Sequence, residues 1–338
     1  MSTPAVTCLI VNWNGAHLLE ECLASLQQAR YRPLQVLVVD NASTDCSRDV
    51  LASFPSVQVV VNKKNEGFTG GNNSGFRSIS TKYVALLNND MTVDSGWLDE
   101  SIACMEADGR VGMVSSRQMQ YREPERIDSL FHVLNPYLVM DSYGHAHRYN
   151  PANPGHSRPG FVLSACGGAM VLRTEMLRQC RGFDDTFFAY HEDADLALRS
   201  FWKGWLCRYV PRALVYHRGS SSFKRVPEIY TYYFERNRIW FQFKNLPATL
   251  LVRHLPALLF MEVRIARVKL FKQHMFGVYL RARRDALRGL RGIIGCRAAV
   301  FSGVTREQMR LFYRLKREHT IPDVDNCYLR CGGRCGNH

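Results

Sequence analysis

Four short apolar runs in the first 90 residues restrict the fold more than any other feature of the chain. They cover residues 6–11, 34–39, 57–61 and 83–87, and between the first two lies a stretch with helical spacing of leucine at 18–26. Strands that are apolar along their whole length and alternate with helices form a largely parallel sheet covered on both faces. We therefore expect an α/β fold with a mostly parallel central sheet flanked by helices.

Polar clusters follow these runs, and ligands on such sheets bind at the carboxyl ends of the strands. We expect the clusters to converge on one rim of the sheet. The candidate binding residues at this rim are Asn12, Asn14, Asp40, Asn41, Glu66, Gly67, Asn72, Asn89 and Asp90.

Taken singly, each cluster also has a plain structural explanation. Asp40 can accept hydrogen bonds from a nucleobase or ribose, or belong to a helix-capping loop. Asp90 can hold a hard metal ion that bridges phosphates, or form an ordinary Asn-Asp turn. His217, at another strand end, can bind metal or diphosphate, or be a surface histidine.

A denser group of titratable residues lies in the second half of the chain, at His191-Glu192-Asp193-Ala194-Asp195. Such groups are costly to pack unless they are solvated, paired or functional. A carboxylate here can act as a general base, although acidic residues also favour a helix start, which we expect near Asp193. Before this group, residues 121–160 have little periodicity and predict a long, partly irregular insertion that can act as a substrate lid.

Together these segments resemble the family 2 glycosyltransferases over about residues 5–222. The matching motifs in the first half are Val-Asn-Trp-Asn-Gly at 11–15, Val-Asp-Asn-Ala-Ser-Thr-Asp at 39–45, Asn-Glu-Gly-Phe at 65–68 and Leu-Leu-Asn-Asn-Asp at 86–90. Those in the second half are Cys-Gly-Gly-Ala-Met at 166–170, Gly-Phe-Asp-Asp at 182–185, His-Glu-Asp-Ala-Asp-Leu at 191–196 and Gly-Trp at 204–205.

The resemblance implies a GT-A nucleotide-sugar-binding fold over residues 1–222. The nucleotide-sugar half would span 1–115, the acceptor half 116–222, and a helical, basic region 223–338. It also implies an inverting single displacement in which no protein nucleophile takes part.

By match to the family motifs, Asp40 would contact the nucleoside and Asp193 would be the catalytic base. Asp90 would hold a divalent metal, Mg²⁺ or Mn²⁺, as the last residue of an Asp-x-Asp element. Asn88 occupies the first acidic position of that element, so the metal would depend on Asp90, His217 and the phosphates. On the acceptor side the match indicates Gly168, Glu192 and Asp195.

Within the family, the motif forms look most like bacterial rhamnosyltransferases that extend lipid-linked cell-surface polysaccharide. This favours dTDP-L-rhamnose as donor and a saccharide or polyprenyl-diphosphate-linked saccharide as acceptor, with a UDP-hexose donor as the alternative. A non-catalytic nucleotide-sugar or carbohydrate-binding protein is the main competing class. An oxidoreductase is disfavoured because the first strand and loop lack the Gly-x-Gly-x-x-Gly fingerprint.

Charge separates the two parts of the chain. The net charge is +14, yet residues 1–220 sum to −1 and residues 221–338 to +15. Aromatic and basic residues mix at 230–244, and an amphipathic stretch follows, which suits a membrane surface. We expect a protein of the cytoplasm bound peripherally to the inner face of the cell membrane, because no run spans a bilayer and no signal peptide is evident. Packing on the catalytic domain, contact with another subunit and RNA binding are the alternatives for this region.

The eleven cysteines are expected to be mostly reduced, small buried residues. A terminal cluster of Cys327, Cys331, Cys335 and His338 lacks the usual Cys-x₂-Cys spacing of zinc sites, and reactive thiols at a flexible end are the favoured interpretation.

Overall fold

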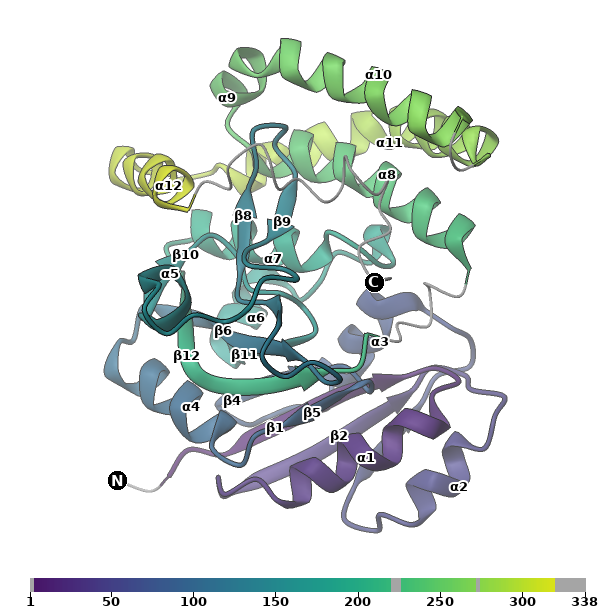
Figure 1. The fold of residues 1–338 in the computed structure, drawn as a ribbon, viewed down its shortest axis with the longest axis vertical. Coiled ribbons are helices and arrows are strands. Elements are labelled where there is room, and N and C mark those ends of the chain that lie inside the picture. Colours follow the sequence, from purple (N-terminus) through teal and green to yellow (C-terminus); the bar gives the residue numbers. More distant parts are fainter. Residues whose placement is uncertain (1–2, 220–225, 272–273, 320–338) are drawn as a thin grey trace.

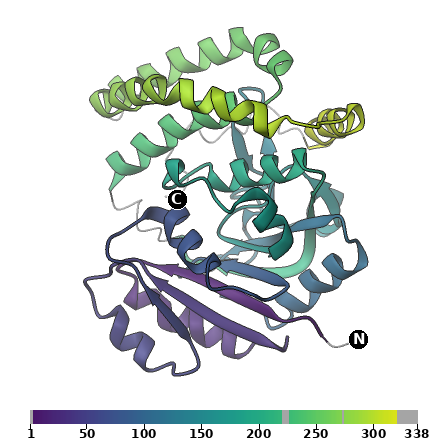
Figure 2. The same cartoon turned by 180° about the vertical axis from the view of Figure 1, so that it is seen from behind.

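The computed structural model describes residues 3–219, 226–271 and 274–319, and it has a central sheet with helices on both faces and a layer of helices at one end (Figure 1). The terminal cysteine cluster lies outside the described residues. Figure 2, from behind, shows the same end layer of helices packed over the second half of the sheet.

The first half of the chain forms the parallel part of the sheet. Strands β1 (Val6–Asn12), β2 (Leu34–Asp40), β3 (Gln58–Val61) and β4 (Tyr83–Leu87) are arranged in the order β3-β2-β1-β4. Every neighbouring pair among them is parallel. The alternating helices are α1 (Ala16–Gln27), α2 (Ser47–Ala52), α3 (Gly67–Phe76) and α4 (Trp97–Ala107). The four predicted strands are thus confirmed.

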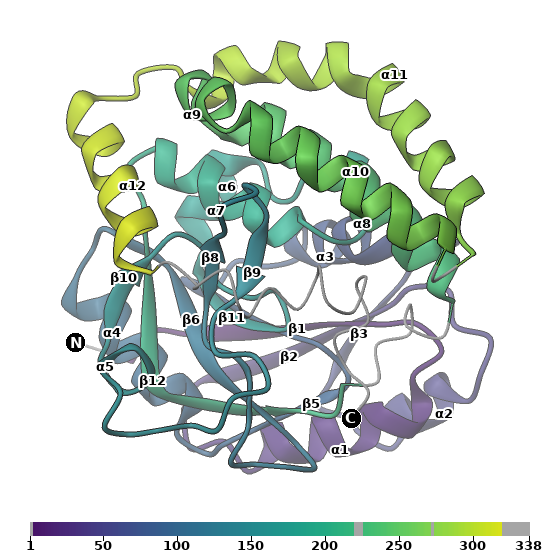
Figure 3. The same ribbon diagram turned by 45° about the horizontal axis from the view of Figure 1, so that its top comes forward.

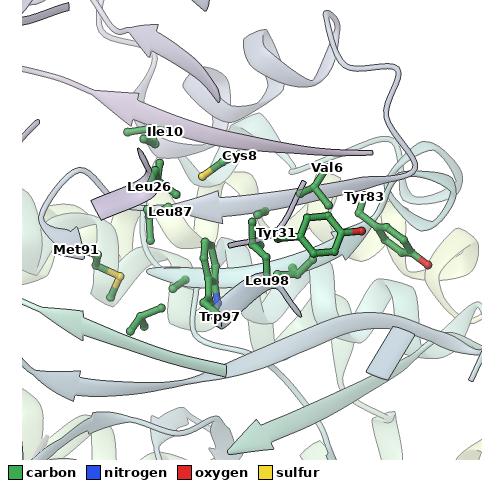
Figure 4. Close-up of a cluster of buried hydrophobic side chains, with 14 of the residues drawn as sticks. Val6, Cys8, Ile10, Leu26, Tyr31, Tyr83, Leu87, Met91, Trp97 and Leu98 are labelled. Carbon is green, nitrogen blue, oxygen red and sulfur yellow. The ribbon is translucent and has the colours of Figure 1, made fainter. Parts of the chain in front are cut away.

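Strands β1 and β4 and the second half of β2 are buried on both faces, with successive side chains on opposite sides of the sheet, whereas β3 at the edge of the sheet is largely exposed. Cys8 and Ile10 pack with Trp97 in one hydrophobic cluster, which Figure 4 shows in close-up. Leu9, between them, belongs to a second cluster with Met176 on the other face. This explains why the runs show no polar alternation.

Beyond β4 the sheet also contains antiparallel pairs, although its longest pairings are parallel. Strand β11 (Ala169–Arg173) runs antiparallel to both β4 and β6 (Val111–Gln120), while β12 (Leu206–His217) is parallel to β6. The short strands β5 (Met91–Val93), β7 (Ile127–Ser129) and β10 (Gly160–Val162) pair antiparallel with β12 or β6. An antiparallel strand that is buried on both faces has the same apolar composition as a parallel one, so composition does not encode its direction.

Between β11 and β12 lie α6 (Thr174–Cys180), the 3₁₀ turn η1 (Asp185–Phe187) and α7 (Glu192–Trp202). Helix α7 begins within one residue of the predicted start at Asp193.

The insertion at 121–160 contains α5 (Pro154–Ser157) and a hairpin of β8 (His132–Leu134) and β9 (Met140–Ser142). The hairpin tip does not act as a lid in this structure, because Leu138 and Val139 are completely buried. Gln242 donates to the carbonyl of Leu138 at 3.2 Å, which fixes the tip beneath the C-terminal helices.

The C-terminal region forms α8 (Pro227–Asn245), α9 (Ala248–Arg253), α10 (Leu255–Phe271), α11 (Phe276–Val300) and α12 (Arg306–Glu318), which arch over the second half of the sheet (Figure 3). Trp202 of α7 shares a hydrophobic cluster with Phe241 of α8 and Phe312 of α12. These helices therefore share a hydrophobic interior with the second half of the sheet-containing region. This agrees with one alternative for the basic region, namely packing on the catalytic domain.

A buried ion cluster ties α7 to α8. Asp195 is fully buried and accepts from Arg199 at 2.7 Å, from Lys244 at 2.7 Å and from Asn245 at 2.8 Å. Lys244 also contacts Asp184 at 2.6 Å. Burial alone would raise the pKa of Asp195, but Arg199 and Lys244 hold it below its ordinary value. Asp195 is consequently an internal anchor, and it does not reach an acceptor as its motif match implied.

We expect Lys244→Met to destabilise the protein, because the change leaves the buried carboxylate of Asp195 and the half-buried one of Asp184 without their shared cation. Removing one partner of a buried ion pair costs about 3–5 kcal/mol. Denaturant unfolding measures this loss. Lys203→Met, at an exposed position after α7, is the matched control and is expected to stay within about 0.5 kcal/mol of the wild type. Equal stability of the two variants would contradict the anchoring role.

Candidate active site

Asn12, the last residue of β1, joins the loops that follow three strands. Its side chain is completely buried; it donates to Ser47 at 2.9 Å and accepts from Asn89 at 2.7 Å. Asn14 accepts from the backbone of Thr44 at 2.7 Å. Asn12 and Asn14 thus hold the rim together from beneath, which confirms that the clusters after β1, β2 and β4 converge.

Asn41 builds the next part of the rim in the same way. Its amide donates to Asn65 and to the carbonyl of Gly67, both at 3.0 Å, and its oxygen accepts from the backbone of Glu66 at 3.1 Å. The loop from Asn65 to Gly67 is therefore fixed to the end of β2. Asn72 is used within α3, where it donates to the carbonyl of Phe68 at 2.8 Å.

Asp40 lies under this rim and is completely buried. It accepts from the backbone of Ser43 at 3.1 Å and from Arg48 at 3.2 Å. The Arg48 side chain is 64% exposed. A nucleoside that contacts Asp40 would have to displace the exposed guanidinium of Arg48. Breaking an exposed ion pair of this kind costs little free energy.

Asp90 and His217 meet where β4 and β12 end. The Nε2 atom of His217 is 3.2 Å from Asp90, and its Nδ1 atom is 2.8 Å from Asp128 of β7. Burial lowers the pKa of His217, but Asp128 and Asp90 outweigh it and raise the pKa to about 10. The imidazole is therefore charged at neutral pH and is held between two carboxylates.

The donor atoms of Asp90 and His217 fit a divalent metal. Cis ligands at bond lengths of about 2.1 Å lie roughly 3 Å apart, close to their 3.2 Å separation. Carboxylate oxygen suits Mg²⁺ and Mn²⁺, and imidazole suits the latter better. A metal ligand must be deprotonated, so binding a cation here would release the proton of His217.

Asp193 lies across the rim at the start of α7. It accepts from the backbone of Gly167 at 2.8 Å, and its side chain is 13% exposed. The neighbouring Gly168 accepts from the backbone of Asn88 at 2.8 Å. Two consecutive glycines thus connect Asp193 to the Asn88-Asn89-Asp90 turn. A side chain at Gly168 would come within 2.7 Å of Met91.

Glu192 is buried, unlike its neighbour Asp193. Burial raises the pKa of Glu192 well above its ordinary value, and the carboxylates of Asp193 and Asp195 add to the effect. Burial therefore favours the protonated form of Glu192. Of the three expected acceptor-side residues, only Gly168 lies beside Asp193 at the rim, whereas Glu192 and Asp195 are interior.

The turn before Asp193 is strained. Phe188, Tyr190 and His191 all have positive φ angles between 65° and 70°, a region that L-residues rarely adopt. Asn237 of α8 holds this turn, because its amide donates to the carbonyls of Phe187, Ala189 and Tyr190 at 2.7 to 2.9 Å.

Asp128 and Asn237 were missing from the residues predicted for the site. Asp128 comes from the irregular insertion and Asn237 from a helix rich in aromatic and basic side chains. Neither belongs to a local motif, so no signal in the sequence alone marks them.

Comparison with solved structures shows which fold the chain has. The chain resembles a mannosyltransferase from Pyrobaculum calidifontis in complex with GDP-Man and Mn²⁺, with a TM-score of 0.52 and 17% identity over 94% of this chain and 85% of that one. It also resembles Staphylococcus aureus TarS 1-349 in complex with UDP-GlcNAc, with a TM-score of 0.56 and 15% identity over 91% and 92% of the two chains. The fold is that of the GT-A glycosyltransferases.

The family follows from the sequence. The family model described as "Glycosyl transferase family 2" matches residues 7–181, and the chain belongs to this family. A curated relative is the N-acetylglucosaminyl-diphospho-decaprenol L-rhamnosyltransferase of Mycobacterium tuberculosis, 28% identical over 67% of this chain and 80% of that protein. The pre-mycofactocin glycosyltransferase of the same species is 33% identical over 63% of this chain and 42% of that protein.

We expect Asp128→Asn to lower the pKa of His217, because a carboxylate close to an imidazole favours its charged form. The ring signals of His217, followed by NMR across a pH titration of metal-free protein, measure the change. Asp49→Asn, which alters an exposed carboxylate in α2, is the control and should leave the titration unchanged. An unaltered pKa in Asp128→Asn would contradict the electrostatic role of Asp128.

Proposed function

We propose that the protein is an inverting, metal-dependent hexosyltransferase that transfers a sugar from a nucleotide diphosphate to an acceptor hydroxyl. The observation that carries this proposal is the connection of Asp193 to the turn of Asp90 through Gly167 and Gly168. It holds a partly exposed carboxylate beside the residues that fit a metal and a diphosphate. A non-catalytic binding protein has no need for a base at this position.

In the proposed reaction the loops after β1, β2 and β3 hold the donor. Asp40 contacts the nucleoside after Arg48 has moved aside, and Asn41 keeps the Glu66-Gly67 backbone in place. Asp90 and His217 would hold a divalent cation, which supplies positive charge against the departing diphosphate.

Asp193 orients the acceptor hydroxyl and takes its proton as the oxygen attacks the anomeric carbon. The backbone N–H of Gly167 donates to Asp193 and keeps one carboxylate oxygen in place. The attack occurs opposite to the leaving diphosphate, so the anomeric configuration inverts. The raised pKa of Glu192 disfavours a second negative charge next to Asp193.

The favoured donor is dTDP-L-rhamnose and the favoured acceptor a saccharide on a polyprenyl diphosphate, in the synthesis of cell-surface polysaccharide. The similarity to the decaprenol-linked rhamnosyltransferase supports both. A UDP-hexose donor is the alternative, and the resemblance to the fold of TarS in complex with UDP-GlcNAc is consistent with it.

We further propose that α9, α10 and α11 bind the cytoplasmic face of an anionic membrane, where a lipid-linked acceptor resides. Among the described residues, no helix is long and apolar enough to cross a bilayer. These helices nevertheless carry most of the exposed large apolar side chains, namely Val252, Leu255, Leu259, Phe260, Val263, Leu270, Phe271, Leu280, Leu287 and Ile294. Exposed arginines stand among them at 253, 264, 267, 281, 284, 288 and 291.

This combination matches an interfacial surface, because apolar side chains enter the headgroup boundary while arginines meet anionic phosphates. Leu280, Leu287 and Ile294 recur every seven residues and form one stripe on α11. Helix α11 also packs on α8 through Ala286 and Gly289, which supports the alternative that this helix has a packing role. The packing and membrane roles therefore use different faces of the same helix.

We expect Asp193→Asn to reduce transfer by roughly 10²–10⁴-fold and to leave donor binding intact, because the change removes a base and preserves side-chain size. Turnover with dTDP-L-rhamnose and UDP-hexoses is measured beside a thermal-shift panel of the same nucleotides, since a ligand that binds the folded state raises its melting temperature. Glu175→Gln, an exposed change on α6, is the matched control. Wild-type turnover in Asp193→Asn would refute the assignment.

The metal is tested in the same panel. Asp90→Ala should remove the part of the donor-induced shift that depends on Mn²⁺ or Mg²⁺, and EDTA should have the same effect on the wild type. Full activity after EDTA treatment would contradict the proposed role of the metal.

We expect the protein to sediment with anionic vesicles at low salt and to be partly released at 1 M salt, where the Debye length is about 3 Å. Leu259→Glu with Leu287→Glu should weaken binding at least about tenfold, because each inserted side chain contributes roughly 1.5–3 kcal/mol. Point variants are preferable to truncation after residue 222, which would also remove Asn237 and Lys244.

The matched control is Val61→Glu, which changes an exposed valine on β3, away from the C-terminal helices. Equal binding of the double variant and the control, or equal binding to neutral and anionic vesicles, would return this face to a role in packing or subunit contact.

A further inference from the structure

Three potential metal ligands of different chemistry meet beside the proposed base. His132, Cys166 and Asp193 each offer one ligand atom, and these atoms lie within 4.8 Å of one another. The Nδ1 atom of His132 is 3.8 Å from Oδ2 of Asp193. Within the ranges that the structure describes, this is the one group of three or more such residues close enough to hold an ion.

Backbone contacts hold all three residues in place. The N–H of His132 donates to Ser164 at 2.8 Å, which joins β8 to the segment that carries Cys166. The carbonyl of Cys166 accepts from Gln118 at 3.2 Å, and Gly167 donates to Asp193 at 2.8 Å. Three separate segments are thus fixed around one point, as a preorganised ligand set requires.

The side chain of His132 has an unused donor atom for a metal. Its Nδ1 atom is buried and has no hydrogen-bond partner, although buried polar atoms in native proteins almost always have one. A lone pair on this nitrogen, aimed at Asp193, is what a metal ion would use. Asp193 keeps a second lone pair on Oδ2 in addition to the one that accepts from Gly167.

The ligand types select the ion. Sulfur and imidazole beside a single carboxylate suit Zn²⁺, whereas Mg²⁺ and Mn²⁺ prefer oxygen. Ligands of a tetrahedral zinc ion lie roughly 3.3–3.8 Å apart; the 3.8 Å between His132 and Asp193 is already close to this range, and the other separations, all within 4.8 Å, have to contract by up to about 1.5 Å. The fourth position would be open to water.

We propose that His132, Cys166 and Asp193 form an inhibitory zinc site. It rests on the proposed function, in which Asp193 is the base. Zinc binding releases the thiol proton of Cys166 to solvent and occupies the carboxylate that would accept the proton of the acceptor hydroxyl. The loaded enzyme binds its donor and does not transfer the sugar.

The binding test uses full-length protein in which Cys327, Cys331 and Cys335 are replaced by serine, so that the terminal cluster contributes no ligand. Co²⁺ is titrated into this metal-free parent and the sulfur-to-cobalt charge-transfer band is recorded. We expect one equivalent of Co²⁺ to produce the band and Zn²⁺ to abolish it. In Cys166→Ser the band should be lost, and in Cys104→Ser, which alters a half-buried thiol of α4, it should remain. A band that persists in Cys166→Ser overturns the site.

The inhibition test measures transfer at saturating Mg²⁺ with increasing Zn²⁺. Cys166→Ser should transfer sugar in the absence of Zn²⁺ and require at least roughly 10- to 100-fold more Zn²⁺ for half-inhibition, because loss of a residue that merely supports a ligand already costs that much affinity. Unchanged inhibition in Cys166→Ser overturns the inhibitory role. The cobalt band tests the metal site and does not depend on turnover. The assignment of Asp193 as base is tested separately, and transfer retained in Asp193→Asn would contradict that assignment alone.

Discussion

The hydrogen bonds from Asn237 to the turn before Asp193 are the constraint on which the rest of the site depends. Three residues in this turn hold positive φ angles, each of which costs of order 1–3 kcal/mol. Without Asn237, the carbonyls of Ala189 and Tyr190 would lose a partner, at about 1–3 kcal/mol each, whereas the Phe187 carbonyl keeps Arg236 and the backbone of Ala189. The two sets of energies are comparable, so the side chain of α8 is what makes this backbone conformation stable. The sheet-containing part of the chain and the C-terminal helices are therefore one structural unit around Asp193.

The same turn explains why adjacent acidic residues behave differently. Helix α7 begins at Glu192, and one step along a helix rotates a side chain by about 100°. Glu192 and Asp195 consequently enter the interior, where burial raises the pKa of Glu192 and where Asp195 is paired with Arg199 and Lys244. Only Asp193 is directed toward Gly167 and the rim. The divergent environments of neighbouring carboxyl groups separate proton-transfer chemistry from structural anchoring.

Much of the first half of the fold could be predicted from the sequence, because its information is local. Each apolar run defines a strand, and the polar residue that ends it, such as Asn12 or Asp40, must lie at the carboxyl edge of the sheet. The antiparallel direction of β11, the contact of Asp128 with His217 and the interior position of Asp195 could not be predicted. They depend on pairings between distant segments: Asp128 and His217 are 89 positions apart, and Asp195 and Asn245 are 50 apart. The motif around Asp193 indicated that acidic residues matter but not which of them faces inward.

The hairpin tip fixed beneath α8 has a consequence for how such an enzyme can diversify. Insertions usually accumulate at exposed loop tips, where added residues disturb little packing. Here the tip residues Leu138 and Val139 lie in the interior; the Leu138 carbonyl accepts from Gln242, and Val139 packs with Met261 and Ile265 of α10. A change in the length of the hairpin would have to be accompanied by changes in those helices. Grafting the acceptor half into another protein of the family would accordingly have to carry the hairpin and helices α8 to α10 together as one inherited block.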